Sequence, residues 1–192
     1  MELVMGLVIG VGLSAACGFR IFVPLLGMSI ANLAGHLTLS PGFEWIGSWP
    51  ALIAFGTATV LEIGAYCFPW IDNLLDLAAT PAAIVAGTIV TASQVGDVSP
   101  LLKWSLAAVA GGGVCGVVQG GSAIVRATSS ATTGGVGNLL VSAVELLASI
   151  AVTFLAIVLP IVCFIGVTWI CYKMVRIIAK SLLLRKRGEP VA

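Results

Sequence analysis

The sequence predicts an all-α, polytopic integral membrane protein with about five or six membrane segments, some of them broken or re-entrant helices. The chain of 192 residues is 59% hydrophobic and only 9% charged, whereas soluble domains carry about 25% charged residues. Apolar runs of roughly spanning length recur along the chain. Glycine, proline and isolated charges interrupt several of these runs, which is typical of discontinuous helices that line a cavity.

The first apolar run, residues 3–39, is too long for one spanning helix and short for two. Gly18 and Pro24 interrupt the run on either side of Arg20, so we expect a broken or re-entrant pair of short helices there. The N-terminus lacks the positively charged region of a signal peptide, and we expect its first helix to be retained.

A loop without lysine or arginine follows and carries Trp45 and Trp49. Tryptophans of this kind settle at membrane interfaces, and the missing positive charge favours the outer face. The next expected span covers residues 51–68 and carries Glu62.

Prolines bound the following segment, residues 69–81, in which Asp72 and Asp76 share one face if the segment is helical. This pattern predicts a short amphipathic helix or an elbow. The apolar stretch after it, residues 82–95, is below spanning length and is interpreted as another half-helix.

Glycines recur every four residues in the next apolar run, residues 101–118 and just beyond, at Gly112, Gly116 and Gly120. Small residues at this spacing let helices pack closely in lipid, and the same faces would suit association of identical chains.

The polarity then changes, because serine, threonine and glycine dominate residues 119–138 around Arg126. We expect no hydrophobic helix to continue through this stretch. It is interpreted either as a flexible loop or as the lining of a cavity, with Thr133 and Asn138 among its polar groups.

The last apolar run, residues 139–172, carries Glu145 and has Pro160 in its middle, which predicts a kinked long helix or two spans. Six basic residues lie in the segment after it. We therefore divide the chain into a transmembrane domain, residues 1–172, and a basic amphipathic tail, residues 173–192, on the cytoplasmic side.

A weak internal echo suggests two repeats, residues 3–95 and 101–172. In each, a small-residue segment with an arginine precedes a helix with a glutamate. Transporters are often built from such repeats, although short apolar similarities also arise by chance.

Charged side chains at the bilayer centre cost at least about 2.5 kcal/mol, so they are candidates for function. They could form structural ion pairs that lock helices together, or they could line a cavity that receives an anionic or polar group. The candidate substrate-binding residues are Arg20, Glu62, Arg126, Glu145, Thr133 and Asn138, with Asp72 and Asp76 as secondary polar positions.

We expect a membrane transport protein, either a transporter or a channel, that handles a small anionic or polar substrate through a central polar cavity. A lipid phosphate would suit the arginines. The alternative is a non-transporting module that binds a lipid or a partner membrane protein. No enzyme, cofactor, metal or nucleic-acid function is expected, because His36 is the sole histidine and the five cysteines are scattered singly through apolar runs.

Three motifs occur in order along the chain: "GFR" with a proline four residues after the arginine, "IDNLLDLAATP", and "TGGVGN". Together they resemble a family of small bacterial inner-membrane proteins known only as a domain of unknown function. That family more often has leucine where this chain has Val136. The resemblance implies a multi-pass protein of the bacterial inner membrane and implies no activity.

Overall fold

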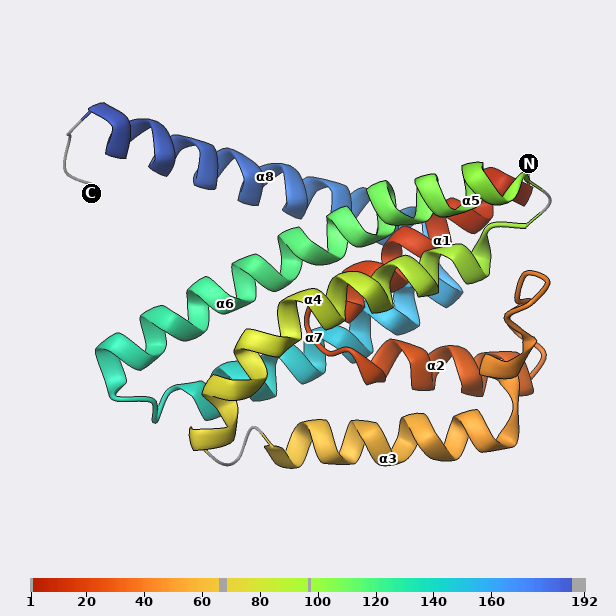
Figure 1. Cartoon of the computed structure of the whole chain (residues 1–192), viewed down its shortest axis with the longest axis horizontal. Coiled ribbons are helices and arrows are strands. Elements are labelled where there is room, and N and C mark those ends of the chain that lie inside the picture. Colours follow the sequence, from red (N-terminus) through yellow and green to blue (C-terminus); the bar gives the residue numbers. More distant parts are fainter. Residues whose placement is uncertain (1, 66–68, 97, 188–192) are drawn as a thin grey trace.

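The computed structural model describes residues 2–65, 69–96 and 98–187, without the side chains of residues 69–78 and 177–187. Every regular element in these ranges is a helix, which confirms the all-α prediction (Figure 1). The elements are α1 Glu2–Cys17, α2 Phe22–Leu33, η1 Glu44–Gly47, α3 Trp49–Ala65, α4 Pro69–Gln94, α5 Pro100–Leu106, η2 Ala107–Gly112, α6 Gly113–Thr133, α7 Asn138–Val158 and α8 Pro160–Arg187.

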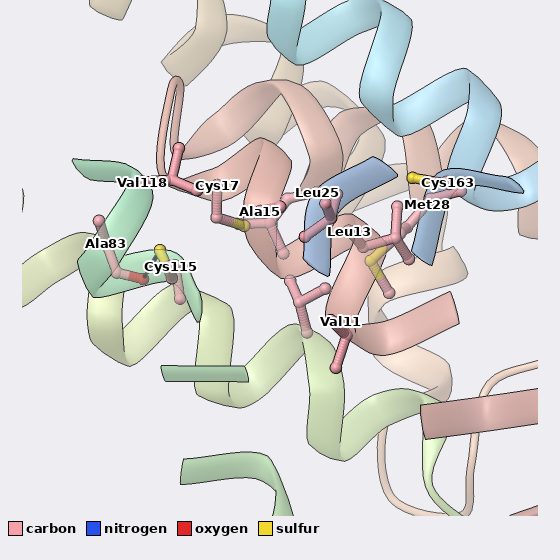
Figure 2. Packing of buried hydrophobic residues seen from close by; sticks show 14 of the residues in the cluster. Val11, Leu13, Ala15, Cys17, Leu25, Met28, Ala83, Cys115, Val118 and Cys163 are labelled. Atoms are coloured by element: carbon pink, nitrogen blue, oxygen red, sulfur yellow. Dashed lines mark hydrogen bonds between the residues drawn. The ribbon is translucent and has the colours of Figure 1, made fainter. Parts of the chain in front are cut away.

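Helix α1 lies at the centre of the bundle and packs against α4, α6, α7 and α8. All its residues from Gly10 to Cys17 are buried, and the side chains of Val11, Leu13 and Cys17 belong to one apolar cluster (Figure 2). A helix that other helices surround has no polar face to show to water, which explains why α1 is apolar on all sides.

The expected break around Arg20 is present. Helix α1 ends at Cys17, and α2 begins at Phe22 and runs back toward the end of the molecule where α1 began (Figure 1). At Gly18 a Cβ atom would lie 2.6 Å from the Cβ of Val118, so only glycine allows α6 to approach this closely. Pro24 lies in the first turn of α2, where its missing N–H removes no helical hydrogen bond.

Small residues bring α1, α4 and the π-helical turn η2 into close contact. A Cβ on Gly10 would lie 2.9 Å from the Cα of Thr91, whose hydroxyl donates to the Gly10 carbonyl over 3.1 Å. The Ser14 hydroxyl donates to the carbonyl of Gly111 in η2. These side chain-to-backbone bonds hold the three segments at a spacing that larger residues would not allow.

The expected boundary at Pro81 is wrong, because α4 is one helix of 26 residues with Pro81 inside it. The expected half-helix, residues 82–95, is therefore not separate: residues 82–94 are the second half of a long helix. A proline inside a membrane helix is tolerated when neighbouring helices or side chains satisfy the freed backbone groups.

The expectation that no hydrophobic helix continues through residues 119–138 is wrong for residues 119–133, since α6 extends to Thr133 and belongs to the apolar helical segment Pro100–Thr133. Its threonine hydroxyls bond within the helix: Thr128 donates to the carbonyl of Ile124, and Thr132 to that of Thr128, each over 2.9 Å. Such back-bonding lets serine and threonine occupy helix interiors. The turn covers only residues 134–137, where Gly134 has a φ of +63°.

The last apolar run forms two helices, which meet at Leu159 and Pro160. Helix α8 continues without a break from Pro160 through residue 173 into the basic segment. Its second half diverges from the bundle, so the end of α8 and the start of α1 lie at opposite ends of the described part of the molecule (Figure 1).

The apolar surface of the bundle is typical of a protein that contacts lipid. On α7 the exposed side chains are apolar, with Val144 65% and Leu147 67% exposed, whereas Ser142, Glu145 and Ser149 on the inner face are buried. Within the described residues, two helical segments are long and apolar enough to cross a bilayer, Pro100–Thr133 and Asn138–Val158. Both observations support association with a membrane.

Candidate functional site

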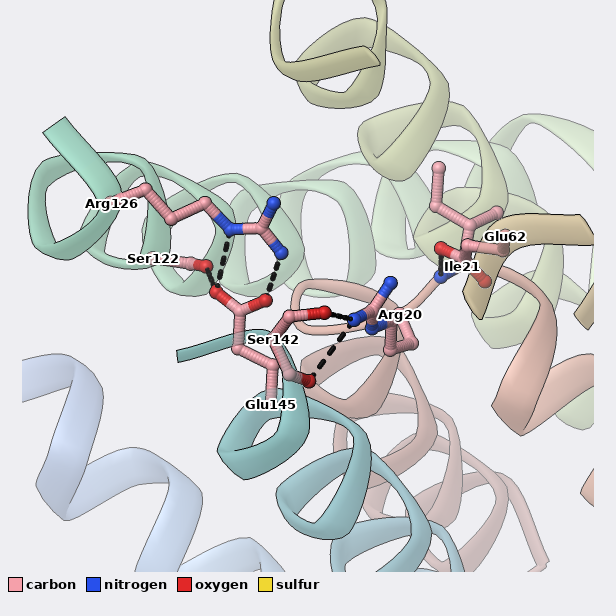
Figure 3. Close-up of polar contacts among 7 residues, drawn as sticks. All are labelled: Arg20, Ile21, Glu62, Ser122, Arg126, Ser142 and Glu145. Carbon is pink, nitrogen blue, oxygen red and sulfur yellow. Dashed lines mark hydrogen bonds and ion pairs between the residues drawn. The ribbon is translucent and has the colours of Figure 1, made fainter. Parts of the chain in front are cut away.

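Arg20 lies in the break between α1 and α2 and is only 1% exposed. Its guanidinium Nη2 donates to the backbone carbonyl of Ser142 over 3.0 Å and to the Ser142 hydroxyl (Figure 3). The side chain therefore points into the bundle toward α7 and not toward lipid. A permanently charged group at this depth needs such acceptors, because it cannot become neutral by losing a proton.

Arg126 and Glu145 form a buried ion pair that joins α6 to α7 (Figure 3). The Arg126 Nε donates to Glu145 Oε1 over 3.0 Å, and its Nη2 donates to Oε2. The hydroxyl of Ser122, one helical turn before Arg126, also donates to Oε1. Two-pronged contact between a guanidinium and a carboxylate fixes orientation as well as charge.

Glu62 binds the backbone at the start of α2 (Figure 3). Its Oε1 accepts the N–H of Ile21 over 2.9 Å, and its Oε2 accepts the N–H of Phe22 over 3.2 Å. Ile21 cannot cap α2 with its own side chain, and the first N–H groups of a helix have no partner within the helix. The carboxylate of α3 supplies that partner and lies where the helix dipole is positive.

The structure thus brings four predicted residues, Arg20, Glu62, Arg126 and Glu145, into one buried region from four parts of the chain (Figure 3). We call this set the charged cluster. Helix α7 connects Arg20 with the Arg126–Glu145 pair. Ser142 accepts hydrogen bonds from Arg20, and Glu145, three residues later on the same face of α7, pairs with Arg126.

Thr133 and Asn138 lie at the turn between α6 and α7, beyond the charged cluster. The exposed Thr133 hydroxyl donates to the carbonyl of Ser129 over 2.7 Å and accepts the N–H of Gly137 over 2.9 Å. The amide of Asn138 donates to the hydroxyl of Ser130 over 2.8 Å. These bonds close the turn, which gives both residues a local structural role.

Asp72 and Asp76 fall in α4, but their side chains lie outside the described residues. Within the described part of the chain, no group of three His, Cys, Asp or Glu side chains is close enough to hold a metal ion. The described cysteines are free, and three of them, Cys17, Cys115 and Cys163, are buried in packing contacts.

Two of the cavities are lined in part by polar residues. A groove of about 480 Å³ lies between α6, α7 and α8 and reaches Ser122 and Glu145 of the charged cluster. A cleft of about 530 Å³ lies near the N-terminus and includes His36 and Gln94. The walls of the groove are almost entirely apolar, whereas the charged cluster that it reaches is polar.

Sequence reasoning missed Ser122 and Ser142. Both could have been found by their spacing from charged residues, since Ser122 precedes Arg126 by four positions and Ser142 precedes Glu145 by three. At those spacings two side chains on a helix share one face. A serine on the same face as a buried charge is a natural hydrogen-bonding partner for that charge or for its counter-ion.

Comparison with known proteins gives one family match. The model of a family described as a domain of unknown function, DUF4126, matches residues 7–180. No curated protein matches the chain, and no solved structure matches it either.

Proposed function

The chain belongs to the DUF4126 family, whose function is unknown, and on that premise we propose that it is a membrane transport protein, a transporter or a channel, for a small anionic or polar substrate. In this proposal the substrate meets the protein at the charged cluster. A phosphate group, free or on a lipid, is one anion that the arginines would suit.

Multi-pass insertion in the bilayer is the first part of the proposal. The apolar outer face and polar inner face of α7 support it. The hairpin formed by α1 and α2 would be re-entrant, because α1 has 16 residues and α2 has 12, which correspond to about 24 Å and 18 Å of helix. Both lengths fall short of the hydrocarbon core of about 30 Å, so the break would lie at depth.

The observation that carries the proposal is the carboxylate of Glu62 on the backbone N–H groups of Ile21 and Phe22. Half-helices whose N-termini point at an anionic group are typical of substrate sites in transporters, and helix N-termini bind anions readily. The Glu62 carboxylate is itself an anion. We interpret the Glu62 carboxylate as occupying the site of the substrate's anionic group, which the substrate takes when Glu62 moves away. Arg20 directly precedes Ile21, one of the two residues whose N–H groups form this site.

A second candidate, a non-transporting module that binds a lipid or a membrane partner, is favoured by the contacts of Arg126 and Arg20. Each of them connects α7 to another part of the chain through buried bonds. Such bonds would hold the helices in one arrangement, whereas transport requires at least two.

The test is an anion-flux assay on purified protein in liposomes, with chloride, inorganic phosphate and acetate as probes. The proposal expects flux of at least one probe, loss of that flux in Arg20→Gln, and a changed concentration dependence in Glu62→Gln, which keeps an acceptor but loses the competing charge. Arg176→Gln, an exposed arginine on α8, is the matched control and should transport normally.

Absence of flux for all three probes with correctly folded protein would favour the non-transporting module. Normal flux in a folded Arg20→Gln variant would separate transport from the charged cluster and refute the assignment of the site.

A further inference from the structure

The groove between α6, α7 and α8 has the features of a lipid site. Its walls are formed by apolar side chains, and several of them are exposed on the outside of the bundle, with Leu140 73%, Val144 65% and Val125 53% exposed. In a bilayer these positions face hydrocarbon chains. The volume of about 480 Å³ is open at that surface, and its lining also includes the buried Ser122 and Glu145.

One basic residue of α8, Lys173, lies near the groove. Ile170 and Met174 of α8 form part of the groove wall, and the exposed Lys173 lies between them in the sequence. At 100° per residue, the Lys173 position is about 60° around the helix from Ile170, at the rim of the groove. Its ammonium lies 5.5 Å from the centre of the Trp169 ring, an arrangement of an aromatic ring and a cation that suits the headgroup level.

We propose that this groove binds one anionic phospholipid of the bilayer, with an acyl chain against the apolar wall and the phosphate near Lys173. The charges are complementary, since a phosphate is negative and Lys173 next to the groove is positive. Basic positions next to apolar gaps between membrane helices recognise anionic headgroups in this way. The inference needs the chain to lie in a bilayer, but it does not depend on whether the chain transports anything.

Glycine in α6 contributes to the groove. A Cβ on Gly121 would lie 1.5 Å from the methyl end of Met174. Any larger residue at Gly121 must therefore displace the end of the Met174 side chain, which lines the groove. The space for an acyl chain depends on this glycine.

The experiment measures bound lipid by native mass spectrometry after purification from nanodiscs of phosphatidylcholine with phosphatidylglycerol. Val144→Trp places a large ring in the groove on an exposed position, so it should abolish the retained anionic lipid without loss of folding. Leu147→Trp is the matched control, because Leu147 is equally exposed on α7 at 67% but does not line the groove. It should retain the lipid.

The headgroup contact is tested separately. Lys173→Ala should lower the affinity for phosphatidylglycerol about fivefold, the effect expected for one lysine near a membrane surface. Arg176→Ala is its control, since Arg176 lies at least about 120° around α8 from both Ile170 and Met174, and it should change the affinity less than twofold.

Equal loss of lipid in both tryptophan variants, or retention in both, would overturn the assignment of the groove. Equal retention of phosphatidylcholine and phosphatidylglycerol by the unmodified chain would show non-selective contact with lipid and overturn the anionic headgroup. An Arg176→Ala effect as large as that of Lys173→Ala would attribute binding to general surface charge and not to this site.

Discussion

Removal of either member of the buried ion pair should destabilise the protein far more than removal of both. Arg126 and Glu145 side chains are 4% and 6% exposed. Arg126→Met leaves the Glu145 carboxylate with the Ser122 hydroxyl but without the guanidinium contacts, and Glu145→Met leaves the buried guanidinium without its carboxylate. Breaking a buried pair on one side costs about 3–5 kcal/mol.

For a chain of this size, 1 kcal/mol corresponds to a shift in melting temperature of about 2–4 °C. Each single variant should therefore melt about 6–20 °C below the unmodified protein. The double variant Arg126→Met with Glu145→Met should recover most of that difference, because a buried pair replaced by apolar residues of similar volume is often neutral.

The assay is thermal unfolding in detergent, followed by the fraction of protein that stays monodisperse. Arg176→Met, at an exposed position on α8, controls for the loss of a positive charge and should change the melting temperature by less than about 2 °C. Melting-temperature losses of the two single variants that simply add in the double variant would refute the predicted coupling. That result would mean that the two side chains act independently of each other.

Three further outcomes follow from the structure. Glu62→Ala should lower the free energy of unfolding by about 1–3 kcal/mol, because it leaves two backbone N–H groups at the start of α2 without their acceptor. These two amides should then exchange hydrogen faster, and unchanged exchange would contradict the prediction. Gly10→Ala should destabilise the protein by about 1–3 kcal/mol, since its Cβ would lie 2.9 Å from a Cα atom of α4. The control Gly113→Ala should be neutral or slightly stabilising, because no atom lies within 4 Å of its Cβ position. Equal melting temperatures of the two variants would be inconsistent with the packing of Gly10 against α4. Topology reporters fused at Gly47 and Ala192 should give opposite signals, with Ala192 cytoplasmic; a periplasmic signal at Ala192 would reverse the assigned orientation.

The helix break at Arg20 was predictable because its causes are local. Glycine weakens a helix and proline fixes φ and removes a backbone donor, whatever surrounds them, and a buried arginine requires acceptors wherever it lies. The acceptor itself was not predictable. Ser142 lies 122 positions away in the chain, and only the packing of α7 against the break selects it.

The errors at Pro81 and in the polar stretch, residues 119–138, have a common cause, because both interpretations used local residue preference without the packing around it. A proline ends a helix in water but can remain inside one between other helices. Hydroxyl groups are polar in a composition count, yet they satisfy themselves on the carbonyls four residues earlier. The role of Glu62 could have been predicted. Helix α2 starts inside an apolar run with no capping side chain of its own, so its first N–H groups need an acceptor from elsewhere in the chain.

The bond between Arg20 and Ser142 has a consequence for biosynthesis. Chains are synthesised at about 5–20 residues per second, so a separation of 122 residues means that the segment supplying Ser142 follows Arg20 out of the ribosome by roughly 6–24 s. During that interval α1 and α2 are complete, but the helix that accepts the guanidinium does not exist. The contact between Arg20 and Ser142, and with it the final packing of the hairpin against α7, can therefore form only after α7 has been made.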